Sequence, residues 1–251
     1  MGKIIVFANQ KGGVGKTTTA VNLGAYLAEA GKRVLLVDFD PQSNTTSSVG
    51  ARRDAPGIYE LLMGKAAADQ TIQSCGVPNL SIIPSSIDLT GATVELVDEK
   101  EREYFLKRCL SPLSAAYDYI FVDCPPSLGL LTLNGLVAAD FVIIPLQCEY
   151  FALEGLSLLL KTVNRVQKGL NTELKIGGIL FTMYDVRTRL AHDVVQEVTG
   201  YFKEKVFRTI IPRNVRLSEA PSFAKPINLY DPECIGARSY QKLAEEVLLN
   251  V

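Results

Sequence analysis

A glycine-rich stretch at residues 10–18 constrains the fold more than any other feature of this sequence. It follows the apolar run 4–8 and leads directly into a helical pattern. The glycines Gly12, Gly13 and Gly15 allow a tight turn, and without Cβ atoms they let backbone N–H groups approach an anion closely. A strand, such a turn and a helix in immediate succession predict a phosphate-binding loop at the edge of a parallel sheet.

Charged and hydroxyl side chains at the end of this stretch extend the prediction. Lys16 is placed to reach the outer phosphates of a bound nucleotide as a point charge, and the Thr17 hydroxyl is placed to bind Mg²⁺. The usual pattern has glycine at the position of Gln10, and this chain instead carries a second lysine, Lys11, ahead of its glycines. The predicted nucleotide-binding residues of the loop are Lys11, Gly12, Gly13, Val14, Gly15, Lys16, Thr17 and Thr18. The alternative interpretation is a glycine-rich turn with incidental lysines.

Composition favours one folded α/β domain. With 251 residues, of which 47% are hydrophobic, the chain can bury a sizeable core, and we predict a single domain over residues 1–251. The formal net charge of −1 gives no global sign of a nucleic-acid partner. The five cysteines are odd in number and form no Cys-x-x-Cys pair, which argues against zinc and a disulfide framework and favours a reducing cytosol. No apolar run reaches the ~18 residues of a transmembrane helix.

Two further apolar runs end in acidic residues. Residues 33–40 fit a buried strand that ends in Asp38 and Asp40, and residues 117–123 fit a strand that ends in Asp123 before a proline pair. Ligands bind outside the carboxyl ends of parallel strands, so these acids are expected near the phosphates held by the first loop. We predict that Asp123 holds Mg²⁺ through water. Capping of a neighbouring helix is the alternative role for Asp38 or Asp40.

The remaining patterns fit a three-layer α/β fold of the P-loop NTPase type, in which helices flank a mostly parallel, twisted sheet. Further strands are expected at residues 80–84, 140–146, 176–183 and 206–211. Beyond the helix that begins at Lys16 and closes at Gly31, helices are expected at residues 57–64, 94–110, 153–166 and 236–251. The polar stretch 41–53 is interpreted as a loop or short helix that changes with the nucleotide. The connection 149–155 is interpreted either as part of a subunit contact or as a solvated link.

A nucleoside pocket is expected at the same edge of the sheet. The predicted strands 176–183 and 206–211 both end there in polar residues. Amide and carboxylate side chains, together with backbone carbonyls, can read the amino edge of adenine through complementary hydrogen bonds. The candidate residues are Met183, Asp185, Pro212, Arg213 and Asn214. Turn capping is the alternative role for Asp185 and Asn214.

The region 187–225 is more basic than the rest of the chain. It holds eight Lys or Arg residues against four acidic ones. Contacts to a DNA backbone need several such side chains on one face and carry no base specificity. Solvated helix faces explain the same numbers equally well, so the residue counts alone leave DNA binding open.

Four motifs in order resemble the ParA/Soj chromosome-partitioning ATPases, which carry the deviant Walker A loop of the MinD/ParA superfamily. They are Lys-Gly-Gly-Val-Gly-Lys-Thr-Thr at residues 11–18, Val-Asp-Phe-Asp-Pro-Gln at 37–42, Asp-Cys-Pro-Pro-Ser at 123–127 and Ile-Pro-Arg-Asn-Val-Arg-Leu-Ser-Glu-Ala-Pro at 211–221. The resemblance covers essentially the whole chain and implies an ATPase that uses ATP and Mg²⁺ as a homodimer. By this resemblance, Lys11 crosses to the other subunit's phosphates and Lys16 binds ATP. Asp40 orients the attacking water and shares the metal site with Thr17 and Asp123.

The resemblance also implies partners. Members of this family bind double-stranded DNA nonspecifically as the ATP-bound dimer, and a ParB-type centromere-binding protein stimulates them. By resemblance, Gly12 lies where that dimer is tight, and the protein is cytoplasmic and nucleoid-associated, without a membrane partner. The candidate DNA contacts are Arg189 first, then Arg187, Arg213, Arg216 and Lys225. Met-Tyr-Asp at residues 183–185 differs from the arginine and asparagine often found at that edge in relatives, which leaves the base contacts open.

Three rival functions share parts of this pattern. A MinD-like ATPase that cycles on the membrane needs a basic amphipathic tail, whereas this chain carries Glu245 and Glu246 near its end. An iron–sulfur reductase of the nitrogenase iron-protein type needs cluster cysteines, and Cys124 and Cys148 lack that family's motif context. A nucleotide-dependent scaffold without catalysis needs only that Asp40 does not support hydrolysis.

Overall fold

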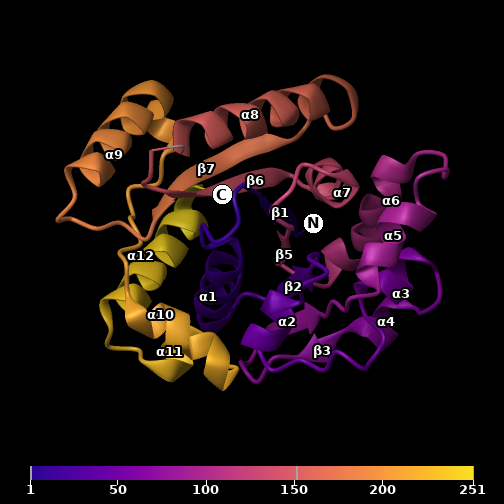
Figure 1. The fold of residues 1–251 in the computed structure, drawn as a ribbon. Helices are drawn as coiled ribbons and strands as arrows, with labels where there is room; N and C mark the ends of the chain where they lie inside the picture. Colours follow the sequence, from indigo (N-terminus) through magenta and orange to yellow (C-terminus); the bar gives the residue numbers. More distant parts are fainter. Residues whose placement is uncertain (1, 151, 251) are drawn as a thin grey trace.

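The computed structural model describes residues 2–150 and 152–250, and these residues form one seven-stranded sheet (Figure 1). The strand order is β3-β4-β2-β5-β1-β6-β7. All neighbouring strands are parallel except β3 and β4. The strands are β1 (Lys3–Phe7), β2 (Val34–Asp38), β3 (Gln73–Ser74), β4 (Leu80–Ile83), β5 (Tyr119–Asp123), β6 (Phe141–Gln147) and β7 (Lys175–Thr182). The prediction of a mostly parallel sheet is confirmed.

Helices cover both faces of this sheet, which gives the expected three layers. The α-helices are α1 (Lys16–Glu29), α2 (Asn44–Ser48), α3 (Ile58–Leu62), α4 (Ala68–Thr71), α5 (Leu89–Glu95), α6 (Phe105–Leu110), α7 (Leu130–Ala138), α8 (Ala152–Gly169), α9 (Arg189–Phe202), α10 (Val215–Glu219), α11 (Ile227–Tyr230) and α12 (Ile235–Asn250). Helices α1 and α12 pack on one face, and α7, α8 and α9 pack on the other. Gly31 has φ of 82° just after α1, as expected of a glycine that closes a helix.

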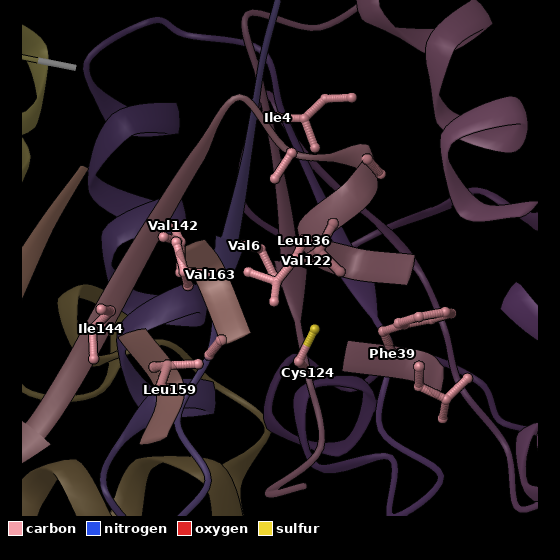
Figure 2. Close-up of a cluster of buried hydrophobic side chains, with 14 of the residues drawn as sticks. Ile4, Val6, Phe39, Val122, Cys124, Leu136, Val142, Ile144, Leu159 and Val163 are labelled. Atoms are coloured by element: carbon pink, nitrogen blue, oxygen red, sulfur yellow. The ribbon is translucent and has the colours of Figure 1, made fainter. Parts of the chain in front are cut away.

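The strand β1 shows how one segment serves two cores. Ile4 and Val6 belong to the core under α7 and α8, whereas Ile5 and Phe7 belong to the core under α1 and α12. Figure 2 shows part of the first core, in which Val6 lies beside Val122. A strand covered on both faces needs apolar residues at every position, which explains the unbroken apolar runs in the sequence. Each large side chain buried in this way contributes about 1.5–3 kcal/mol.

The helix expected over residues 94–110 is wrong. This stretch divides into the end of α5, a turn, a short 3₁₀ helix at Arg102–Tyr104 and α6. Glu101 has φ of 54°, in the left-handed region that interrupts a helix. Residues 98–103 are all charged, so they have no apolar face to bury against the sheet, and the chain turns there in solvent.

The strand expected over residues 206–211 is also wrong. An isolated bridge joins Val206 to Ile179 of β7, and the N–H groups of Phe207 and Ile211 donate to the β7 carbonyls of Ile179 and Phe181 at 3.0 and 2.9 Å, but among the residues described the segment between them forms no continuous ladder. The N–H groups of Arg208 and Thr209 donate instead to the two carboxylate oxygens of Glu246 in α12, at 2.7 and 3.1 Å. Since Phe207 and Ile211 donate to β7, the N–H that a regular strand would have paired between them is that of Thr209, and the final helix satisfies it instead.

Two expected segments extend to residues outside the described part of the chain. The connection 149–155 includes Phe151, and the final helix was expected to reach Val251. Helix α8 begins at Ala152, and α12 ends at Asn250. Over residues 2–150 and 152–250, no helix has the length and apolar character needed to cross a bilayer.

Candidate active site

The loop between β1 and α1 has the conformation that its glycines predict. Gly13 and Gly15 have φ of 72° and 85°, in the left-handed region that glycine enters without a steric penalty. Val14 between them is buried, and its carbonyl accepts a hydrogen bond from the Thr182 hydroxyl at 2.8 Å. The end of β7 therefore fixes the centre of the loop.

Hydrogen bonds also fix the start of the loop. The Asn9 amide donates to the Pro145 carbonyl in β6 at 2.7 Å, and its carbonyl oxygen accepts from the Lys11 N–H at 3.0 Å. The Lys16 ammonium donates to the Lys11 carbonyl at 3.1 Å. Burial lowers the pKa of Lys16, while the nearby Asp123 carboxylate favours its charged form. The loop thus holds a desolvated amine where a phosphate would bind.

The strand register brings the acids to this loop. Asp123 is the register partner of Phe7 in β1 and of Asp38 in β2. Its Oδ2 atom accepts hydrogen bonds from the Thr17 hydroxyl at 2.6 Å and the Thr45 hydroxyl at 2.7 Å. Its Oδ1 atom is buried and has no hydrogen-bond partner among the residues that the structure describes. Such an oxygen is costly to leave unsatisfied, so the site has capacity for a cation or for water bound to one.

Burial makes two of these acids weak. Burial, followed by the neighbouring Asp123 charge, raises the pKa of Asp38 to about 7, and burial raises the pKa of Asp123 to about 6. A cation would favour ionised Asp123, because an opposite charge lowers a carboxyl pKa. Mg²⁺ fits this place, since the Thr17 hydroxyl and the Asp123 carboxylate offer hard oxygen ligands beside the phosphate loop. When bound, Mg²⁺ neutralises charge on phosphate oxygens.

Replacing Asp123 with asparagine should stabilise the metal-free chain. The folded-state pKa of about 6 lies above the ordinary value of 3.8, so the ionised carboxylate opposes folding above both values. The penalty is on the order of 3 kcal/mol above about pH 6, and it disappears below about pH 4, where both states are protonated. In a chelator, the variant should melt several degrees higher than wild type at about pH 7.5 and at a similar temperature at about pH 4. A lower melting temperature at the higher pH would contradict this burial penalty.

Asp40 lies just beyond β2 and is buried at this edge of the sheet. Its Oδ1 atom accepts a hydrogen bond from the Gln42 N–H at 3.0 Å. Its charge interacts with that of Lys16, which places the two side chains in one electrostatic site. A carboxylate accepts about four hydrogen bonds, so Asp40 retains the capacity to orient a water molecule.

A cavity of about 390 Å³ lies where the nucleoside pocket was expected. The phosphate loop, the end of β7, the segment 211–218 and Tyr240 of α12 contribute to its walls. Four of the five predicted residues line it, namely Met183, Pro212, Arg213 and Asn214. Its volume falls in the range of small-molecule pockets, about 300–1,000 Å³.

The fifth predicted residue, Asp185, is not among the residues that line this cavity. Its two carboxylate oxygens accept hydrogen bonds from the Arg187 guanidinium at 2.8 and 2.7 Å. This pairing holds the pKa of Asp185 well below its usual range. Asp185 also accepts from the Arg187 N–H at 3.1 Å, which matches the turn-capping alternative.

Sequence reasoning missed the hydroxyl groups of α2. Thr45 donates to Asp123, and Thr46 donates to Asp38 through both its N–H and its hydroxyl, at 2.7 and 2.6 Å. Asp38 therefore accepts hydrogen bonds from the first turn of α2, which is the helix-capping role given above as the alternative for Asp38. The signal was present at residues 43–48, where a hydroxyl-rich run follows a strand that ends in acids. Buried carboxylates need such donors.

The fold and this site define a P-loop nucleoside triphosphatase. A glycine loop with a buried lysine lies beside the hydrogen-bonded Thr17 and Asp123 and the buried Asp40, which is the arrangement that the P-loop pattern predicts. The AAA domain family model matches residues 2–176. The chain is 65% identical to the chromosome-partitioning ATPase Soj of Treponema pallidum, over 99% of this chain and 98% of that protein. It is 58% identical to the sporulation initiation inhibitor protein Soj of Bacillus subtilis, over 100% of both. The chain belongs to the Soj/ParA family of chromosome-partitioning ATPases, which confirms the resemblance.

Solved structures of other proteins share this fold. Cobyrinic acid a,c-diamide synthase from Mycobacterium smegmatis with bound ADP and magnesium is 40% identical, with a TM-score of 0.86 and coverage of 99% of this chain and 94% of that one. A variant of McdA from Cyanothece in complex with ATP is 26% identical, with a TM-score of 0.88 and coverage of 100% and 97%. Both relatives therefore share this fold over nearly their whole length.

Proposed function

We propose that this chain is an ATP-timed, DNA-binding switch that acts in chromosome or plasmid segregation. It hydrolyses ATP with Mg²⁺, dimerises when ATP is bound, and binds DNA nonspecifically as that dimer. A ParB-type centromere-binding protein stimulates the hydrolysis, and the chain works in the cytoplasm on the nucleoid. Family membership supports the ATPase activity and the segregation role. The nucleotides and magnesium in related structures support the choice of cofactors.

The position of Lys11 carries this proposal. Lys16 already supplies a buried ammonium inside the loop, whereas the Lys11 ammonium pairs with Glu149 and its side chain is 45% exposed. A lysine at the open rim of the loop can reach the phosphates of a second subunit. Phosphoryl transfer is catalysed mainly by positioning and charge stabilisation, so such a lysine would act like an arginine finger supplied in trans. Hydrolysis then requires the dimer.

Gly12 supports the same arrangement. Its φ lies outside the left-handed region, and a Cβ atom added there would lie 3.7 Å from Pro126, which is an ordinary contact. Gly12 is also exposed. Nothing in the described part of one protomer therefore requires glycine at this position. A second subunit packed closely against the loop would require it, because a larger side chain would hold the two subunits apart.

Two exposed arginines at the start of α9 are the best candidates for DNA contact. The side chains of Arg187 and Arg189 are 82% and 94% exposed. Arg189 pairs with Asp193 at 3.7 Å, and an ion pair this exposed contributes little to stability, whereas Arg187 holds Asp185 through two short bonds. The Arg189 guanidinium can therefore exchange its partner for a DNA phosphate at small cost, and the exposed outer face of Arg187 lies next to it.

The other basic candidates differ in their surroundings. Arg216 forms ion pairs with Glu219 at 2.9 Å and with Asp231 at 3.3 Å, so it would have to give up two carboxylates to reach DNA. Lys225 is exposed, and Arg213 is exposed at the rim of the nucleoside cavity. We therefore rank these three below the arginine pair.

Reversing both charges, with Arg187→Glu and Arg189→Glu in one chain, should remove most ATP-dependent DNA binding. Each lost phosphate contact weakens binding and lowers the slope of log affinity against log salt by about one. Fluorescence anisotropy with a random-sequence duplex measures both quantities across a salt series. Wild type should bind with ATP but not with ADP, and the variant should lose at least about tenfold in affinity at moderate salt.

The control for this experiment is Gly12→Val. It should bind ATP but remain monomeric, and it should lose DNA binding for that reason. The double arginine variant should still dimerise with ATP in analytical ultracentrifugation. Loss of its dimer would mean that the arginines are structural, and unchanged DNA affinity would contradict the proposed surface.

A further inference from the structure

Two buried side chains, those of Asp38 and Thr46, join the two ends of the loop at residues 38–46, which carries Asp40. Asp38 is the last residue of β2, and Thr46 lies in α2, 8 residues later. Asp38 Oδ2 accepts two hydrogen bonds from Thr46, from its N–H at 2.7 Å and from its hydroxyl at 2.6 Å. Both residues are fully buried, and hydrogen bonds made away from water are costly to break. The ends of the loop are therefore held together firmly.

Thr46 also ties this loop to the neighbouring strand. Its hydroxyl accepts a hydrogen bond from the N–H of Ser85, just beyond β4, at 2.9 Å. The hydroxyl thus donates to one strand end and accepts from another, which uses both functions of a threonine side chain. Valine has nearly the same shape but can do neither.

The closed loop holds two groups of the candidate active site. The Asp40 N–H donates to Asp38 Oδ1 at 3.3 Å, so Asp38 contacts the backbone of Asp40 as well as Thr46. The Thr45 hydroxyl donates to Asp123 from the same loop. The position of the loop therefore sets both the acid expected to orient water and a hydroxyl on the metal-site acid.

We propose that Thr46 is a positioning residue for ATP hydrolysis: it acts through Asp38 to set the position of Asp40. This inference rests on the proposed ATPase function. Misplacement of a reacting group by about 1 Å can lower a rate by about 10²-fold. ATP affinity depends mainly on the phosphate loop, to which Thr46 does not belong. Loss of the Thr46 hydroxyl should therefore affect the rate of hydrolysis and leave nucleotide binding in place.

Thr46→Val in the full-length chain tests this inference. Single-turnover hydrolysis should slow by at least about tenfold, while the dissociation constant of a fluorescent ATP analogue should change by less than about threefold. Thr46→Ser keeps the hydroxyl and should restore hydrolysis. Thr71→Val is the matched control, because Thr71 is also fully buried and its hydroxyl donates to the Ala68 carbonyl of α4 at 2.9 Å. It should leave both quantities unchanged.

Asp38→Asn provides a second measurement if Thr46→Val does not fold. Asparagine keeps the shape of aspartate but turns one acceptor into an NH₂ donor, so it loses the bond from either Thr46 or Asp40. Hydrolysis should again slow while ATP still binds. Normal hydrolysis by these variants, or an equal loss of affinity and rate, overturns the positioning role alone. Absence of hydrolysis in the wild-type chain contradicts the proposed function and this inference together.

Discussion

ATP binding should disappear when Lys16 is replaced by alanine. The buried Lys16 ammonium donates to the Lys11 carbonyl at 3.1 Å, inside the turn that is shaped for phosphates. Bound ATP would offer it charged oxygens, and a hydrogen bond to a charged group contributes about 1.5–3 kcal/mol. Loss of that bond and of the charge should weaken ATP binding by at least about 100-fold.

The fold should survive this substitution. Lys16 is the first residue of α1, alanine is the best helix former, and burial opposes the lysine charge, as its lowered pKa indicates. The variant should melt within a few degrees of wild type, yet a fluorescent ATP analogue should not saturate it. Lys11→Ala is the control: it should bind ATP normally but hydrolyse it slowly. Wild-type affinity for ATP in Lys16→Ala would contradict the assignment of the loop.

The centre of the site could be predicted from the sequence because its residues occupy fixed places relative to the strands. Parallel strands present their carboxyl ends at one edge of a sheet. A glycine loop after β1 and acids at the ends of β2 and β5 must therefore meet there. The register confirms this, since Asp123 pairs with both Phe7 and Asp38. Local sequence patterns were therefore sufficient to predict that the phosphate loop and these acids lie together.

The features that the sequence did not predict depend on hydrogen bonds and contacts between residues that lie far apart in the chain. Thr45 is 78 residues from Asp123, to which it donates. Glu246 is 37 residues from Thr209, whose N–H it binds in place of a strand partner. Tyr240, in the final helix, lines the cavity in which a nucleoside is expected. No local periodicity indicates such pairs, which explains why the strand prediction failed and why the α2 hydroxyls were missed.

Asp40→Ala should give an ATP-bound dimer that stays on DNA. The Asp40 carboxylate accepts a hydrogen bond from the Gln42 N–H, and in the proposed site it would orient water, whereas Lys16, Thr17 and Asp123 would hold the phosphates and the metal. Its removal should therefore spare ATP binding and lower hydrolysis by at least about 100-fold, as for loss of a general base. Single-turnover hydrolysis and the dissociation rate from DNA in ATP measure the two effects. Rapid hydrolysis by the variant would contradict the role of Asp40.

Asp40→Asn separates chemistry from loop shape. Asparagine retains an oxygen for the Gln42 N–H but lacks the carboxylate charge, so hydrolysis as slow as that of Asp40→Ala would assign the effect to the carboxylate itself.

The double variant Asp40→Ala with Thr46→Val tests whether Thr46 acts through Asp40. If Thr46 acts through Asp40, the double variant should hydrolyse ATP no more slowly than Asp40→Ala alone, because groups that act as one unit are not additive. Additive losses would mean that Thr46 affects hydrolysis by another route, such as the Thr45 bond to Asp123.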